Sequence, residues 1–210
     1  MSRPRFITLE GGEGVGKSTL AAGLEEAINR IGQTVVRTRE PGGSVGADEI
    51  RKLIVTGAGD RWSGVTETLL LTAARSDHLE RTIRPAIERG DWVICDRFID
   101  STFAYQVVAR GLPYETFVAL NKVVAAPTPD LTLILDLDVK TGLARALNRR
   151  GGEARFETLD EAFHNNVRQA FRDVAAREPE RCAVIDAGQP PELVLRQACA
   201  LVSARLGLTL

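Results

Sequence analysis

The chain has 210 residues, of which 44% are hydrophobic and 26% are charged, with 27 lysines and arginines against 28 aspartates and glutamates. The resulting net charge of −1 argues against a protein that binds nucleic acid through an overall excess of positive charge. The ordinary composition argues against a disordered chain, so we expect a single domain over residues 1–210. No apolar run is long enough for a membrane span, and the three cysteines are scattered, so we expect a cytoplasmic protein with no membrane partner.

Short apolar runs alternate along the chain with longer segments of helical periodicity. Five of these runs are typical of strands covered on both faces, and they lie at residues 6–9, 34–37, 92–95, 131–135 and 182–185. Apolar residues at helical spacing predict helices over residues 20–31 and 163–174, and the Pro190-Pro191 pair predicts the start of a last helix. This alternation predicts an α/β fold of three layers, with a central five-stranded parallel sheet and helices on both faces.

The segment that follows the first predicted strand, residues 11–18, matches the pattern G-x-x-x-x-G-K-[ST]. Its glycines allow backbone N–H groups to surround a phosphate, and the next helix directs its positive end at the same place. Lys17 is expected to reach the β- and γ-phosphates of a nucleoside triphosphate, and Ser18 to place its hydroxyl on Mg²⁺. The predicted ATP-binding residues are Gly11, Gly12, Glu13, Gly14, Val15, Gly16, Lys17, Ser18 and Thr19.

Glu13 is unusual in this loop, because phosphates repel a carboxylate. It could accept a hydrogen bond from a sugar hydroxyl, or it could lie beside the waters of a metal ion. The alternative is a side chain that points into solvent.

Two classes of protein share such a loop, namely nucleotide-driven switches or motors and small phosphotransferases. A guanine-specific switch needs an Asn-Lys-x-Asp base reader and an Asp-x-x-Gly motif. Asn121 and Lys122 are followed by two valines, and no aspartate has a glycine three residues later. The sequence therefore favours a phosphotransferase.

The third predicted strand ends on Asp96, and Arg97 follows it directly. The carboxyl edge of the sheet is where such folds place a metal-site carboxylate, so this pair could serve Mg²⁺ and phosphate together. A structural ion pair is the alternative. Asp136 ends the fourth strand in the same way, but no arginine follows it, so Ser18 and Asp96 are the predicted metal residues.

Phosphoryl transfer gathers negative charge that positive side chains must neutralise, yet the variable positions of the phosphate loop contain no arginine. Arg149, Arg150 and Arg155 flank a Gly-Gly pair between two predicted helices. We expect residues 149–156 to form a lid that closes over the donor, excludes water and supplies catalytic arginines. A solvated basic loop is the alternative.

In combination, these features resemble the thymidylate kinase family, in particular bacterial members that carry catalytic arginines in the lid. The resemblance extends from Phe6 to about Gly188. It rests on residues 6–11 (FITLEG), 38–43 (TREPGG), 73–75 (AAR), 96–106 (DRF, then S, then AYQ) and 129–132 (PDLT). It implies a P-loop kinase fold, Mg²⁺-dependent transfer of the γ-phosphoryl group of ATP to dTMP, and a homodimer. A kinase for another nucleoside monophosphate is the alternative.

The resemblance also implies the site residues. Arg75, supported by Thr102 and Gln106, would hydrogen-bond the thymine ring. Tyr105 would crowd the 2′ side of the sugar, and Glu13 would lie near the 3′-hydroxyl. The dTMP-binding residues implied in this way are Glu13, Pro41, Arg51, Leu71, Arg75, Arg97, Thr102, Tyr105 and Gln106. The predicted catalytic residues are Lys17, Arg97, Arg149, Arg150 and Arg155.

Leu71 is a departure from the family, because four residues before Arg75 its members typically have a phenylalanine that stacks on thymine. Leucine can pack against a base but offers no aromatic face. We therefore expect either weaker stacking on the base or compensation by Phe98 or Phe103.

Overall fold

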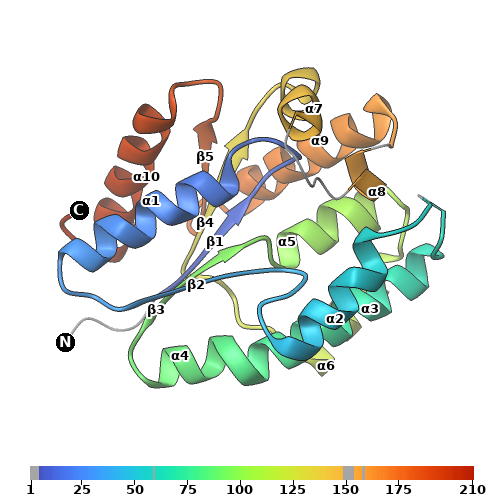
Figure 1. The fold of residues 1–210 in the computed structure, drawn as a ribbon, viewed down its shortest axis with the longest axis horizontal. Helices are drawn as coiled ribbons and strands as arrows, with labels where there is room; N and C mark the ends of the chain where they lie inside the picture. Colours follow the sequence, from blue (N-terminus) through green and yellow to red (C-terminus); the bar gives the residue numbers. More distant parts are fainter. Residues whose placement is uncertain (1–4, 59, 149–153, 158) are drawn as a thin grey trace.

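The computed structural model describes residues 5–58, 60–148, 154–157 and 159–210. At its centre is a sheet of five parallel strands in the order β2-β3-β1-β4-β5 (Figure 1). The strands are β1 (Phe6–Glu10), β2 (Val35–Arg39), β3 (Trp92–Asp96), β4 (Leu131–Asp136) and β5 (Cys182–Asp186). The five predicted strands are confirmed, and each extends one or two residues beyond its predicted carboxyl end.

Helices connect the strands, as the sequence predicts. The α-helices are α1 (Lys17–Arg30), α2 (Val45–Val55), α3 (Gly64–His78), α4 (Arg84–Glu88), α5 (Ile99–Thr102), α6 (Tyr114–Val123), α7 (Val139–Leu147), α8 (Ala154–Glu157), α9 (Glu161–Arg177) and α10 (Pro191–Leu206). Two π-helical turns, η1 (Leu79–Ile83) and η2 (Phe103–Val108), continue α3 and α5. Among the described residues, no helix is both long and apolar enough to cross a bilayer.

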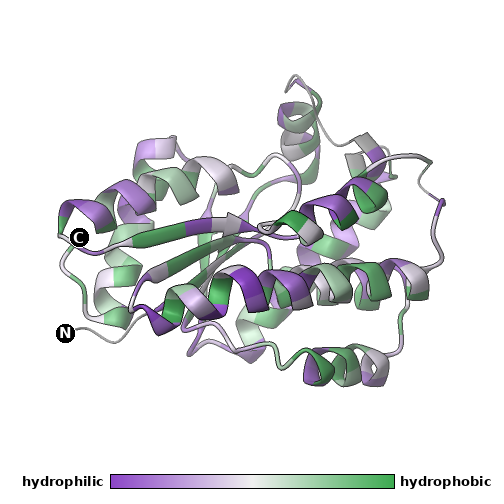
Figure 2. Cartoon of the chain, turned by 60° about the horizontal axis from the view of Figure 1, so that its bottom comes forward, coloured by the Kyte–Doolittle hydropathy of each residue, from purple (hydrophilic) through white to green (hydrophobic). Residues whose placement is uncertain are grey.

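The helices cover both faces of the sheet, which confirms the three-layer prediction. On one face, Leu9 of β1 belongs to the same buried cluster as Leu24 of α1 and Ala198 of α10. On the other face, Ile134 of β4 shares a buried cluster with Phe171 of α9. Figure 2 shows green, hydrophobic residues along the strands, whereas green and purple alternate along the helices. Burial of one stripe of helices such as α1, α9 and α10 therefore holds the layers together.

Short polar side chains fix where several helices begin. Ser63 accepts a hydrogen bond from the backbone N–H of Thr66 at the start of α3, and Asp160 does the same for Phe163 at the start of α9. Such caps satisfy N–H groups that have no partner inside the helix. The helix predicted to end at Ile31 is shorter in the structure, because α1 ends at Arg30 and Ile31 is 39% exposed.

Because all five strands are parallel, their carboxyl ends lie at one edge of the sheet. β1 is the central strand, and Leu9 near its end pairs with Asp96 at the end of β3. The phosphate loop leaves β1 at this edge, so the fold places the loop between the segments that follow β3 and β4. Ligands of open α/β sheets bind at such an edge.

Candidate active site

The phosphate loop curls around the amino group of Lys17. Gly14 and Gly16 have φ values of 66° and 97°, a region that glycine occupies without steric cost. Lys17 begins α1, and its Nζ donates hydrogen bonds to the carbonyl oxygens of Gly11 (3.0 Å) and Gly12 (2.7 Å). The ammonium group is therefore held inside the loop, where the sequence motif predicts it.

The environment of Lys17 makes its charge responsive to what enters the loop. Burial, followed by repulsion from Arg97, lowers the pKa of Lys17 to about 8, against attraction from Asp96 and Glu13. A phosphate group placed in the loop adds negative charge, which favours the protonated amine.

Ser18 and Asp96, the predicted metal residues, lie together. The Ser18 hydroxyl donates a 2.8 Å hydrogen bond to Asp96 Oδ2. Asp136, the alternative carboxylate, instead accepts two hydrogen bonds from Arg168, at 2.6 and 3.0 Å. Among the described residues, no three His, Cys, Asp or Glu side chains form a metal-binding group. A pair of one hydroxyl and one carboxylate fits Mg²⁺, which keeps several waters and takes its other ligands from phosphates.

Arg97 connects the phosphate loop to η2. Its Nη2 donates to Glu13 Oε1 (2.8 Å) and to the Tyr105 hydroxyl (3.1 Å), while its Nη1 donates to Gly11 O and Ser101 Oγ, both at 3.1 Å. Arg97 has a φ of 69°, which is uncommon for a residue with a side chain. Backbone strain of this kind often occurs at functional sites.

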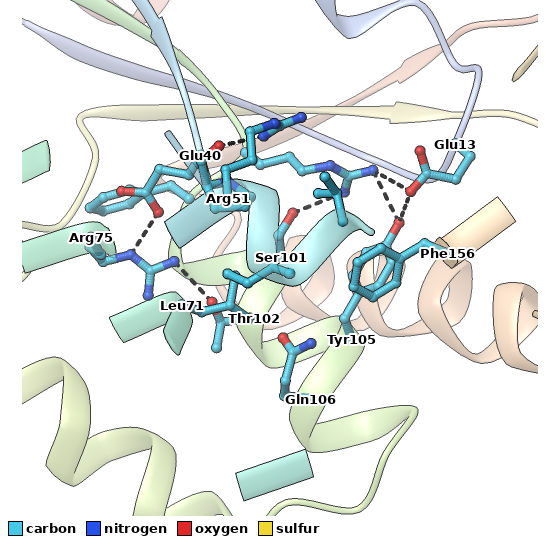
Figure 3. Close-up of a pocket in the computed structure, with 15 residues that line it drawn as sticks. Glu13, Glu40, Arg51, Leu71, Arg75, Ser101, Thr102, Tyr105, Gln106 and Phe156 are labelled. Carbon is cyan, nitrogen blue, oxygen red and sulfur yellow. Dashed lines mark hydrogen bonds and ion pairs between the residues drawn. The ribbon is translucent and has the colours of Figure 1, made fainter. Parts of the chain in front are cut away.

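Glu13 is held by charged and polar neighbours. Its Oε1 accepts hydrogen bonds from Arg97 and from the Tyr105 hydroxyl, the latter at 2.9 Å. In Figure 3 the side chains of Glu13 and Tyr105 point toward each other. Burial alone would raise the pKa of Glu13, but the charges of Arg97 and Lys17 and the Tyr105 hydrogen bond lower it to about 2. Glu13 is therefore ionised and directed into the site, and the solvent-facing alternative does not hold.

Glu10, at the end of β1, holds the turn after β3. It is fully buried, and it accepts hydrogen bonds from the Phe98 N–H (2.8 Å) and the Ser101 hydroxyl (2.6 Å). Burial, followed by repulsion from Asp100, raises its pKa to about 7. Glu10 is not among the predicted site residues, although a glutamate directly before a phosphate loop indicates a role in the site.

A cavity lies next to the phosphate loop, and all nine residues predicted to bind dTMP line it. A larger cavity is lined by the predicted ATP-binding residues 13–19 and by Asp96. Gly11 and Gly12 line a third, smaller cavity instead. Glu13, Glu40, Arg51 and Arg97 line both larger cavities, so the two spaces adjoin.

At the far end of the smaller of these two cavities, Arg75 is 3% exposed and its guanidinium is fixed by three neighbours. Its Nε donates to Glu40 Oε2 (2.7 Å) and its Nη2 donates to Thr102 Oγ1 (2.9 Å), as Figure 3 shows. Its Nη1 donates to Asn121 Oδ1 (3.5 Å). Glu40 in turn lies 3.1 Å from His78 Nδ1. Glu40 is not among the predicted site residues, although it lies in the Arg-Glu-Pro-Gly-Gly segment on which the resemblance rests.

The aromatic side chains around Leu71 differ from the prediction. Leu71 and Phe98 line the cavity, and the Arg75 guanidinium lies 5.1 Å from the centre of the Phe98 ring. Phe103 does not line the cavity, since its ring contacts Phe117 of α6 at 5.9 Å. The proposed compensation by Phe103 is therefore wrong. Phe156 of α8, which the sequence analysis missed, lines the cavity instead.

The predicted lid arginines fall into two groups. Arg149 and Arg150 lie outside the described residues. Arg155 of α8 is buried, its Nη1 lies 2.5 Å from Glu67 Oε2, and it donates to the carbonyl oxygen of Ile54 (2.8 Å). It lines neither of the two larger cavities, so the structure does not bring Arg155 to the phosphate loop.

Helix α7 rests directly on the phosphate loop. A Cβ atom at Gly14 would lie 1.9 Å from the carbonyl oxygen of Gly142, and a Cβ at Gly142 would lie 2.5 Å from that of Glu13. Real Cβ atoms do not approach backbone oxygens this closely, so both positions need glycine. No motif in the sequence predicts this contact.

Comparisons with known proteins point to one family. The family model of thymidylate kinase matches residues 9–198. A thymidylate kinase of Caulobacter vibrioides is 50% identical over 209 residues, which cover 99% of this chain and 100% of that protein. A thymidylate kinase of Rhizorhabdus wittichii is 52% identical over 94% of this chain and 96% of its own. The crystal structure of thymidylate kinase from Ehrlichia chaffeensis superimposes with a TM-score of 0.77 at 32% identity, covering 95% and 98% of the two chains.

Proposed function

This chain belongs to the thymidylate kinase family, and from that membership we propose which of its residues carry out the family's reaction. The protein has a P-loop kinase fold and transfers the γ-phosphoryl group of ATP to dTMP, giving dTDP and ADP. One observation carries the assignment of the site: two adjoining cavities share the lining residues Glu13, Glu40, Arg51 and Arg97. The larger is the donor site and the smaller is the acceptor site.

In the donor site, Lys17 and the backbone of the phosphate loop bind the phosphates of ATP. The two carbonyl oxygens that hold Lys17 Nζ keep the ammonium at the centre of the loop. Phosphoryl transfer proceeds mainly through alignment of the reacting oxygens and neutralisation of their charge. Lys17 supplies part of that charge, and no covalent intermediate is needed.

In the acceptor site, Arg75 donates to a carbonyl of thymine, a role supported by its fixed guanidinium. Glu13 accepts a hydrogen bond from the 3′-hydroxyl, and Tyr105, which Glu13 and Arg97 hold in place, crowds the 2′ side of the sugar. Arg97, which lines both cavities, binds the phosphate between donor and acceptor.

Mg²⁺ accompanies ATP, and Ser18 and Asp96 are the residues that would hold it. When bound, the ion neutralises charge on the phosphates. Within residues 149–156, Arg149 and Arg150 are the arginines that close over the donor. Arg155 instead anchors this segment, since its guanidinium is buried against Glu67.

An assay with ATP and a panel of monophosphates tests the site assignment. ADP formation is measured with dTMP, dUMP, dGMP and dCMP, and dTMP is expected to give the highest kcat/KM. If dTMP were no better than the other three monophosphates, the thymine-specific pocket would be wrong.

Replacement of Leu71 by phenylalanine tests where the base lies. An aromatic face beside the base is expected to tighten dTMP binding by about fivefold, the gain of roughly 1 kcal/mol that an aromatic contact adds. Isothermal titration calorimetry measures the Kd. Leu193→Phe on α10, a position that lines neither cavity, is the matched control and should leave the Kd unchanged. An unchanged Kd for Leu71→Phe would contradict the placement of the base.

We further propose that the protein works in the cytoplasm as a homodimer formed through α3 and α6. Leu69 of α3 is 51% exposed and Val118 of α6 is 45% exposed, although both are large and apolar. The two helices contact each other, and exposed apolar residues on neighbouring helices are candidates for an interface. Leu69→Glu is expected to give monomers in sedimentation velocity, whereas Ile31→Glu, at an exposed site beyond α1, should leave the dimer intact. A monomeric unmodified protein would refute the proposal.

A further inference from the structure

Glu67 of α3 is a fully buried acid to which neither the sequence nor the reaction assigns a role. Its Oε1 accepts a 2.9 Å hydrogen bond from Gln106 Nε2 and lies 3.2 Å from Arg110 Nε. Its Oε2 lies 2.5 Å from Arg155 Nη1. One carboxylate therefore joins α3 to η2, to the loop that follows η2, and to α8.

The contact with Gln106 determines which end of its amide group faces the carboxylate. A carboxylate only accepts hydrogen bonds, so the amide must present its NH₂ group to Glu67. Gln106 lines the acceptor cavity, and its amide is drawn in Figure 3 among the side chains there. Within the described part of the chain no donor binds Gln106 Oε1, which retains access to the cavity.

Arg155 keeps the carboxylate in this place, and Arg110 adds a second, more distant positive charge. Arg155, whose side chain is fully buried, contacts Oε2, and Arg110, whose side chain is 17% exposed, contacts Oε1. Two positive charges therefore compensate the one negative charge of Glu67. Reversal of the Gln106 amide would remove its hydrogen bond to Glu67 and set its carbonyl oxygen against Glu67 Oε1. Such a contact is unfavourable, because both oxygens are acceptors and the buried amide loses its partner.

We propose that Glu67 is a positioning residue that determines base specificity, by fixing Gln106 with its amide oxygen toward the base. Arg75 then offers a donor and Gln106 an acceptor in the same cavity. Thymine presents a carbonyl acceptor at C4 beside an N3–H donor, which matches this order, whereas cytosine presents an amino donor beside an N3 acceptor, which opposes it. The inference rests on the proposed placement of the base beside Arg75 and Gln106.

The test is the ratio of kcat/KM for dTMP to that for dCMP in Glu67→Gln. A glutamine at position 67 can donate or accept, so it no longer dictates the orientation of the Gln106 amide. The ratio is expected to fall by at least about tenfold, since a site built from fixed hydrogen-bonding groups loses discrimination with them. The change should lie in KM for dTMP, with KM for ATP unchanged. Values for dUMP should follow those for dTMP, because uracil has the same donor and acceptor order.

Arg110→Met is the matched control, because it removes a different partner of Glu67 and leaves the Gln106 contact in place; it should keep the ratio. Glu67→Asp retains the charge but withdraws the carboxylate by one methylene group, so it gives the same test should Glu67→Gln fail to fold. Equal losses for dTMP and dCMP in both Glu67 variants would show a purely structural role and overturn the inference.

A second arm combines the substitution with Gln106→Met. If Glu67 acts through Gln106, the double variant should have the same dTMP to dCMP ratio as Gln106→Met alone. A further loss of discrimination would overturn the inference. Wild-type protein that does not prefer dTMP over dCMP would instead refute the placement of the base itself, which separates the two failures.

Discussion

Replacement of Lys17 by methionine is expected to lower kcat for dTMP phosphorylation by about 10²–10³-fold, the range for losing one positioned charge at a developing anion. Lys17 Nζ is already held by the carbonyl oxygens of Gly11 and Gly12, so the charge is in place before ATP binds. Steady-state kinetics with ADP detection measure the effect. Lys140→Met, at a lysine whose side chain is 75% exposed, is the control and should keep its kcat.

The pH dependence offers a second check on Lys17. Because its pKa is lowered to about 8, the amine of the unliganded enzyme is charged below that pH and loses its charge above it. In the wild-type protein kcat/KM for ATP should therefore fall as the pH rises through 8. Lys17→Met should lack this descending limb; if it kept the limb, another group would be responsible.

Replacement of Arg97 by alanine is expected to reduce kcat by about 10³-fold, the lower end of the effects attributed to arginines at a transferring phosphoryl group. Arg97 lines both the donor and the acceptor cavity, and it holds Glu13 and Tyr105. The free energy of unfolding should fall by less than the roughly 4 kcal/mol that corresponds to this loss of rate. Steady-state kinetics and urea denaturation measure the two quantities.

The double variant Arg97→Ala/Glu13→Gln distinguishes the catalytic role of Arg97 from a structural one. Without Arg97, the mostly buried carboxylate of Glu13 loses its nearest positive charge, at 2.8 Å. Neutralising Glu13 should restore part of the lost stability but none of the turnover. Turnover that recovered together with stability would show that Arg97 serves only as a structural ion pair.

The central sheet is the part of the fold that the sequence predicted correctly, because its strands carry a local signal. Apolar runs marked all five strands, and the spacing of the phosphate loop marked Lys17 and Ser18. The nine acceptor residues came from the family resemblance, and the structure gathers them around one cavity. The contact between Ser18 and Asp96 followed from the rule that parallel strands end at one edge.

The parts that the sequence did not predict depend on contacts between distant segments. Arg155 and Glu67 are far apart in the chain, so no local pattern shows that the expected lid arginine is buried against Glu67 of α3. Phe98 and Phe103 are both phenylalanines, so residue type does not distinguish them. Phe103 begins a π-helical turn, and the period of an ordinary α-helix does not predict which face of such a turn a side chain occupies. Tertiary packing decides both cases.

The contact between Gly14 and Gly142 limits how this enzyme can change. Helix α7 continues from that contact to Leu147, so one backbone-to-backbone contact sets the spacing between the donor loop and this helix. A substitution at either glycine would have to push the loop and the helix apart, and no single further substitution can restore the missing space. In redesign of this protein, both positions should therefore be kept as glycine.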